Sequence, residues 1–311
     1  MKKVLFALFA VASLASCSNN EVIELNREQI AFGDTFVDNA TKADYSTDKT
    51  VDGFKVYGTA TYTANGSEKT TLVFKGNTVS RNGKADNVAW DCDGAAQYWL
   101  PNTDYTFAAI VDGGESGVSA MPTTIDFTVK DGEDNKDLLY ATATVSTDEN
   151  ATPDPADVNA NGVVAFNFNH LLSKMMFKVK NETNQKYEVT EIKVTGVAKD
   201  GEYTIGGAWS ATGTTNLTFG TATVEGGATK PASESRQIIP VAQELDVTVT
   251  YYVLDGDGAK VGNALTKTGT ISSTFEQNTV YVVTATLSGK TINFSLGTVN
   301  GWANEDGTLG I

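Results

Sequence analysis

The chain has 311 residues and a formal net charge of −15, from 38 acidic and 23 basic side chains. This charge repels phosphate backbones, so we expect no nucleic-acid partner. One histidine and two cysteines exclude a histidine-rich metal site and a fold held by several disulfides, whereas the length is sufficient for two ordinary cores.

The first 17 residues have the pattern of a lipoprotein export signal. Two lysines precede an apolar run from Val4 to Leu14, and small residues lead directly into Cys17. The run is too short to span a membrane. The site resembles the bacterial lipobox, in which the cysteine is acylated and becomes the first residue of the mature chain. We therefore expect residues 1–16 to be a signal peptide and Cys17 to be lipidated; the alternative is an ordinary secretory signal with a chance cysteine.

Residues 17–42 contain one short apolar strand followed by a basic residue. Ile30, Phe32 and Phe36 lie on one side of an extended run, which is typical of a strand in a sheet. The residues that follow Lys42 are polar, so we expect this lysine to be accessible to a protease.

Beyond residue 50 the sequence predicts many short β-strands. Val247, Val249, Tyr251 and Val253 alternate with polar residues, a pattern typical of an antiparallel sheet with one solvated face. Turn signals separate the runs, at Asn65-Gly66, Asn82-Gly83, Asp131-Gly132, Asp200-Gly201 and Asp255-Gly256-Asp257-Gly258. The fold class predicted is all-β, built from β-sandwiches.

A polar stretch divides the chain near its middle. Residues 145–162 have almost no apolar periodicity and are the best candidate for a linker. We therefore expect one domain over residues 43–155 and a second over 156–311. Beyond the linker the alternation changes parity between Leu172 and Met175, which predicts a bulge or a corner.

One hexapeptide has half of a calcium-binding pattern. Residues 157–162 place Asp157, Asn159 and Asn161 at ligand positions 1, 3 and 5 and glycine at position 6. Position 12, which requires a bidentate glutamate, is Phe168. We therefore expect a turn and no metal.

The other candidates for chemistry favour structural roles. His170 is in line with Phe166 and Phe168, so a packed histidine is favoured over a catalytic base. Cys92 has no neighbour that would activate it. No phosphate-binding loop, dinucleotide fingerprint or nucleophile elbow is present, so we expect neither catalysis nor a cofactor.

Four aromatic residues cluster within a short region: Trp90, Tyr98, Trp99 and Tyr105. They fit a sugar-stacking platform, but burial in a β core explains them better because each ring removes a large area from water. We favour the core.

Several segments together resemble one family, the fimbrillins, which are the Mfa-like and FimA-like pilin lipoproteins of type V pili. The segments are Ile30-Ala31-Phe32, Thr41-Lys42-Ala43, Tyr98-Trp99-Leu100-Pro101, Tyr105-Thr106-Phe107, 137–141, 166–174, 192–196, Gly201-Glu202-Tyr203, Trp209, Ile239-Pro240, Ile292-Asn293-Phe294-Ser295 and 299–302. The Phe-x-His-x-x-Ser-Lys run and the closing Gly-Trp are the most specific. The chain departs from the family by lacking glutamine directly after Ile239-Pro240.

The resemblance implies two transthyretin-like β-sandwiches that polymerise outside the cell. A surface trypsin-like protease would cut between Lys42 and Ala43, with Arg27 as the alternative site, and remove the first strand. A strand from residues 291–311 of another copy would then fill the groove, and Ile292, Phe294 and Leu296 alternate there as a donor strand requires.

The partners expected from the resemblance are other copies of this chain, related pilins, the protease and, for the precursor, the outer membrane through its lipid. The location expected is a fimbria on the cell surface. A removable strand together with a donor strand favours a shaft subunit over a tip or an anchor. The alternatives are a surface lipoprotein that binds glycans without polymerising, and an acidic glycoside hydrolase with two paired carboxylates.

Overall fold

The fold is all-β, as the sequence predicts. The computed structural model describes residues 28–37, 51, 53–81, 90–112, 121–159, 162–289 and 291–300. The expected signal peptide, Cys17, Lys42 and Ala43 lie outside these residues. Within them the regular structure consists of strands and one 3-10 turn, η1 (Gly132–Asp134), and there is no helix long and apolar enough to span a membrane.

Seven of the described strands form one sheet near the N-terminus. Their order is β1 (Phe32–Val37), β8 (Val164–His170), β7 (Leu139–Ser146), β5 (Thr103–Val111), β2 (Gly53–Ala64), β3 (Ser67–Arg81) and β4 (Trp90–Cys92). The sheet is curled so strongly that its two edge strands come together: Gly33 of β1 lies against the Trp90 ring of β4. The aromatic core of this half is enclosed by the curl.

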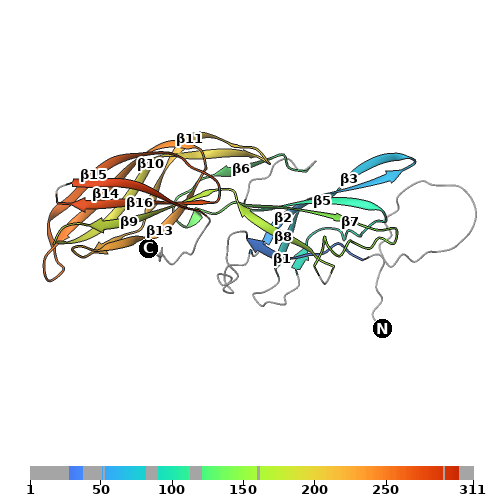
Figure 1. The fold of residues 1–311 in the computed structure, drawn as a ribbon, viewed down its shortest axis with the longest axis horizontal. Coiled ribbons are helices and arrows are strands. Elements are labelled where there is room, and N and C mark those ends of the chain that lie inside the picture. The colour runs from blue at the N-terminus through green and yellow to red at the C-terminus, as the bar shows by residue number, and fades with distance from the viewer. Residues whose placement is uncertain are drawn as a thin grey trace, which may run out of the picture.

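The remaining described strands form two sheets that face each other across a second core. The larger contains β11 (Trp209–Phe219), β10 (Lys186–Thr204), β14 (Ala242–Leu254) and β15 (Lys260–Thr274), and β10 also pairs with β12 (Ala222–Val224) and β6 (Thr124–Thr128). The smaller has the order β13 (Thr229–Ile238), β9 (Ser173–Asn181), β16 (Thr279–Ser288) and β17 (Thr291–Asn300). The two halves lie end to end along the long axis of the molecule (Figure 1).

The period-two pattern of β14 explains how this inner strand of the larger sheet packs, with one face toward the core and one face outward. Val247, Val249 and Tyr251 are buried in the second core, whereas Thr248 faces outward and its hydroxyl lies 3.0 Å from that of Thr268 on β15. The predicted alternation is confirmed in this strand.

The tight turn at Asn65-Gly66 is also confirmed. Both residues have positive φ, 53° for Asn65 and 69° for Gly66, and they join β2 to β3 as a hairpin. Asparagine and glycine tolerate this left-handed conformation at little cost, which is why the sequence signal is reliable here.

The sheets divide the chain at a different place from the expected boundary between residues 155 and 156. β8 lies beyond that boundary, yet it pairs with β7 and β1, and Phe166 and Phe168 are buried in the first core. The change of sheet occurs at Leu171 and Leu172, immediately before β9, where the alternation changes parity. Two large rings on β8 complete the N-terminal core, so the strand belongs to that half.

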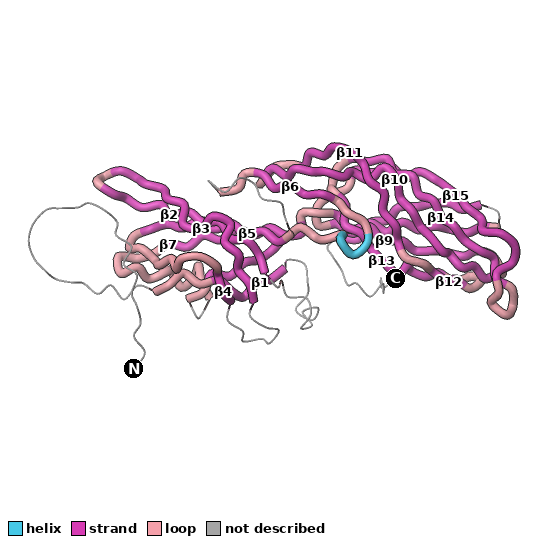
Figure 2. The backbone as a smooth tube through the Cα atoms, turned by 180° about the vertical axis from the view of Figure 1, so that it is seen from behind, coloured by secondary structure: helices cyan, strands magenta, loops and turns pink. Residues whose placement is uncertain are grey.

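A second crossing joins the halves. After β5 the chain leaves the N-terminal sheet, forms β6 against β10 and returns in β7 (Figure 2). Ile125 and Val129 are thereby buried in the C-terminal core. Asp131 anchors this excursion, because its carboxylate accepts hydrogen bonds from the backbone N–H and hydroxyl of Thr218 and from Nε of Arg236. Burial works to raise the pKa of Asp131, but these hydrogen bonds lower it overall.

Candidate functional site

The segment before and within β1 lies between two parts of the chain. The Ile30 N–H donates to the Gln97 carbonyl at 2.9 Å, and the Glu28 carbonyl accepts from the Trp99 N–H at 3.1 Å. On the other side β1 runs parallel to β8, and the Val164 N–H donates to the Ala31 carbonyl at 2.9 Å. The segment is therefore a strand inserted along a seam of the curled sheet.

Its side chains are part of the N-terminal core. Ile30 is 2% exposed and Phe32 is 3% exposed. The Phe32 ring lies edge-on to Phe74 and Phe107, with centroids 5.0 and 5.6 Å away, and is stacked with Phe166 at 5.9 Å. Burial of each such side chain is worth about 1.5 to 3 kcal/mol. Removing the strand would therefore open an apolar groove lined by aromatic rings.

The other expected strand residues have different outcomes. The backbone of Phe36 pairs with Asn167, after an irregularity between Gly33 and Phe36, but its side chain lies outside the described residues. Lys42 and Ala43 also lie outside them, so cleavage between these two residues stays a prediction.

Gly33 is a site residue that sequence reasoning missed. A Cβ atom at this position would lie 3.1 Å from Cγ1 of Val163 and 3.2 Å from Cδ1 of Trp90, so the position accepts at most a small side chain. The signal available in the sequence is a glycine inside a strand pattern, which often marks a close approach.

The expected donor residues lie on the edge strand β17. β17 pairs with β16 along its whole length, and Ile292, Phe294 and Leu296 are partly buried against the C-terminal core. The Phe294 ring covers Gly269 of β15 so closely that a Cβ at residue 269 would collide with it. No other described strand pairs with the second edge of β17.

The aromatic cluster is divided between core and surface. Trp99 and Tyr105 are fully buried and pack edge to face, with centroids 4.9 Å apart. Trp90 is partly buried against Phe54, whereas Tyr98 is 48% exposed. The four rings therefore do not form a common exposed platform, and the core interpretation holds for Trp99 and Tyr105.

Two polar side chains of the calcium-like hexapeptide accept hydrogen bonds from the backbone, whereas Asn161 lies outside the described residues. Asp157 accepts a hydrogen bond from the Ser146 N–H at 3.1 Å, and Asn159 accepts one from the Val163 N–H at 3.0 Å. Phe168, at the twelfth position, is buried in the core. Among the residues that the structure describes, no group of three or more His, Cys, Asp or Glu side chains could hold a metal ion.

His170 lies where the chain passes from one half to the other. Its Nδ1 contacts Oδ2 of Asp137, which precedes β7, and the neighbouring Leu171 N–H donates to the Leu138 carbonyl at 2.9 Å. This pairing connects β8 to the returning segment, so the histidine has a structural partner at the junction of the halves.

Cys92 is expected to be chemically inert. Burial, reinforced by the charge of Asp93, raises the pKa of its thiol to about 11. Because only the thiolate is nucleophilic, a Cys17→Ala protein should react with a maleimide at pH 8 about 100-fold more slowly than a free cysteine with a pKa of about 8.5. The same protein unfolded in denaturant is the control, and equal rates in both states would contradict a protected thiol.

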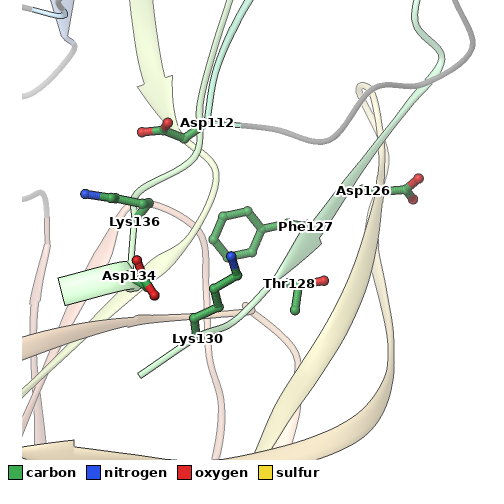
Figure 3. Close-up of a pocket in the computed structure, with 7 residues that line it drawn as sticks. All are labelled: Asp112, Asp126, Phe127, Thr128, Lys130, Asp134 and Lys136. Carbon is green, nitrogen blue, oxygen red and sulfur yellow. The ribbon is translucent and has the colours of Figure 1, made fainter. Parts of the chain in front are cut away.

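A cavity of about 390 Å³ lies beside β6 (Figure 3). It is lined by Asp112, Asp126, Phe127, Thr128, Lys130, Asp134 and Lys136. Burial raises the pKa of the Asp112 carboxyl. The positive charge of Lys136 acts to lower this pKa, and the negative charge of Asp137 acts to raise it further. The Thr128 hydroxyl donates to Asp200 at 2.9 Å, and the lining residues that the structure describes include no serine, cysteine or histidine. These described residues offer the cavity charged and hydroxyl groups for hydrogen bonding.

Comparison with known proteins places the chain in a family. A family model described as fimbrillin-like matches residues 41–302, and the chain therefore belongs to the fimbrillin-like family. This confirms the resemblance seen in the sequence. The match begins beside Lys42, so Ile30, Phe32 and Gly33 precede it.

Solved structures share the fold. A fimbrial protein from Bacteroides vulgatus ATCC 8482 has a TM-score of 0.58 and 19% identity, covering 88% of this chain and 99% of that one. A candidate cell adhesion protein from Bacteroides ovatus ATCC 8483 has a TM-score of 0.55 and 12% identity, covering 90% and 99%. A search of curated proteins found no match.

Proposed function

We propose that this chain is a shaft subunit of a fimbria and that it polymerises by exchanging strands between copies. The precursor carries lipid on Cys17 and is held at the outer membrane. Cleavage between Lys42 and Ala43, rather than at Arg27, removes the strand that contains β1. A strand from residues 291–311 of the next copy takes its place, and each half of the subunit is a transthyretin-like sandwich.

The burial of Ile30 and Phe32 is the observation that carries this proposal. These side chains complete a core from a segment that lies at the beginning of the chain and precedes the predicted cleavage site. Once this strand is lost, the groove exposes rings to water, and a strand from another copy would restore both burial and main-chain hydrogen bonds. Because the groove and the donor lie on different halves, the contact is heterologous and extends into an open filament.

Membership of the fimbrillin-like family supports a structural role in a fimbria. Fimbrillin-like proteins are structural rather than catalytic, and one similar structure is that of a fimbrial protein. The partners proposed are therefore other copies, related pilins and a surface trypsin-like protease, with no cofactor. The glycan-binding alternative needs exposed rings, but Trp99 and Tyr105 belong to the core.

Sequencing the N-terminus of the protein recovered from the cell surface tests the proposal. We expect the fimbrial form to begin at Ala43 and to lack fatty acid, and the precursor to carry a fatty-acid label that a Cys17→Ala variant loses. A surface form that keeps Cys17, its lipid and the strand of Ile30 would rule out the proposed maturation.

A further inference from the structure

The first and last described strands share a short pattern. Ile30-Ala31-Phe32-Gly33 and Ile292-Asn293-Phe294-Ser295 both read Ile, polar or small, Phe, small. We propose that this pattern sets the register of exchange: Ile292 takes the place of Ile30, Phe294 that of Phe32 and Ser295 that of Gly33. The incoming strand then runs in the direction of β1, parallel to β8. This inference rests on the proposed function and adds the alignment of the partner strand.

The place of Phe32 is shaped for an aromatic ring. The Phe74 ring of β3 and the Phe107 ring of β5 pack edge to face with Phe32. The Phe166 ring of β8 is stacked with it, at an interplanar angle of 21°. Phe294 restores all three ring contacts. A leucine at this position, as in a register shifted by two residues, would leave part of the space empty, and unfilled core volume is costly.

Two donor side chains would be more deeply buried in the groove than in their own domain. In its own domain β17 is an edge strand, and Ile292 and Phe294 are only partly covered there. In the groove they would have the surroundings of Ile30 and Phe32, which are almost completely buried. The same two side chains therefore gain burial when they move from their own half to the groove of a neighbour.

The place of Gly33 distinguishes the possible alignments. Val163 and Trp90 approach this position so closely that only a small side chain fits without a large displacement. The proposed register places Ser295 there. A strand shifted by two residues would place Gly297 there, and a strand running in the opposite direction, with Phe294 kept in place, would place Asn293 there.

These three residues offer matched variants. Asn293, Ser295 and Gly297 are all exposed on β17, and a Cβ added to Gly297 would meet no atom nearer than the Val282 carbonyl oxygen at 3.9 Å. Valine at any one of them leaves the C-terminal core untouched and suits a strand. Only the residue that faces Trp90 and Val163 in the assembled polymer should be sensitive to the substitution.

The test is cleavage of the full-length precursor by a trypsin-like protease, followed by light scattering. We expect Ser295→Val to slow polymerisation about tenfold or more, because overpacking at a tight site costs at least that factor. Asn293→Val and Gly297→Val should polymerise like the unaltered chain, and Ser295→Gly at least as fast. Thermal unfolding before cleavage verifies that each variant is folded.

Other results would overturn the register. If Gly297→Val is the blocked variant, the strand is shifted by two residues toward the C-terminus. If Asn293→Val is blocked, the strand is shifted by two residues the other way or runs in the opposite direction. If all variants polymerise normally, β17 does not enter the groove. Failure of the unaltered chain to polymerise would instead contradict the proposed function itself. A synthetic peptide of residues 291–300, with and without Ser295→Val, provides a second measurement as an inhibitor of polymerisation by the cleaved protein.

Discussion

Treatment with a trypsin-like protease is expected to convert the precursor from monomer to polymer, and Lys42→Ala should abolish the conversion. While Ile30 and Phe32 fill the groove, the site for a neighbouring strand is occupied. Cleavage makes this apolar surface available, and pairing with another copy buries it again. Size-exclusion chromatography with light scattering should show nearly complete conversion of the unaltered chain and a persistent monomer for Lys42→Ala.

Two controls define what this result means. Arg27→Ala removes the other candidate site and should leave polymerisation unchanged. A chain ending before Thr291 should be cleaved but remain monomeric, because it has a groove and no donor strand. If the Lys42→Ala protein formed filaments with the Ile30 strand still attached, strand exchange would be disproved. A surface lipoprotein that binds glycans would then be the favoured function.

Phe32→Ala should cost the precursor about 3 to 5 kcal/mol of unfolding free energy, the usual penalty for removing a buried ring. The ring contacts Phe74, Phe107 and Phe166, and the surrounding strands belong to one curled sheet that cannot close on the space left behind. Denaturant unfolding of the uncleaved protein measures the effect.

Leu265→Ala is a suitable control for that measurement. Leu265 is also apolar, but it is 43% exposed on β15, so its truncation should change stability by less than about 1 kcal/mol. If Phe32→Ala were as mild as Leu265→Ala, the N-terminal strand would contribute little to the core, and its removal would open no groove that drives assembly.

Short sequence patterns correctly predicted those features that depend on only a few neighbouring residues. The Asn65-Gly66 turn follows from tolerance of positive φ, and the alternation of Val247, Val249 and Tyr251 follows from one solvated face. In each case the physical cause acts within a few residues, so the sequence alone contains it.

The same local rule misled where a strand has neighbours on both faces. Alternation with one solvated face would place one side of β2 in solvent, yet Phe54 and Val56 are buried on one side and Tyr57 is buried on the other, against the C-terminal core. The polar stretch 145–162 suggested a domain boundary, but β8 beyond it returns to the first sheet. Pairing between strands that are distant in the sequence decided both the burial of Tyr57 and the position of the boundary. The periodicity of a single strand does not indicate which other strand it will pair with.

The sequence by itself determined that this is an all-β, fimbrillin-like chain, because family motifs and period-two alternation are present in the order of residues. Only the tertiary structure decided that Phe32 sits among three rings and that Gly33 faces Trp90 and Val163. These contacts join residues from β1, β3, β4, β5 and β8, and the shape of the groove exists only once the sheet has curled and brought its edges together.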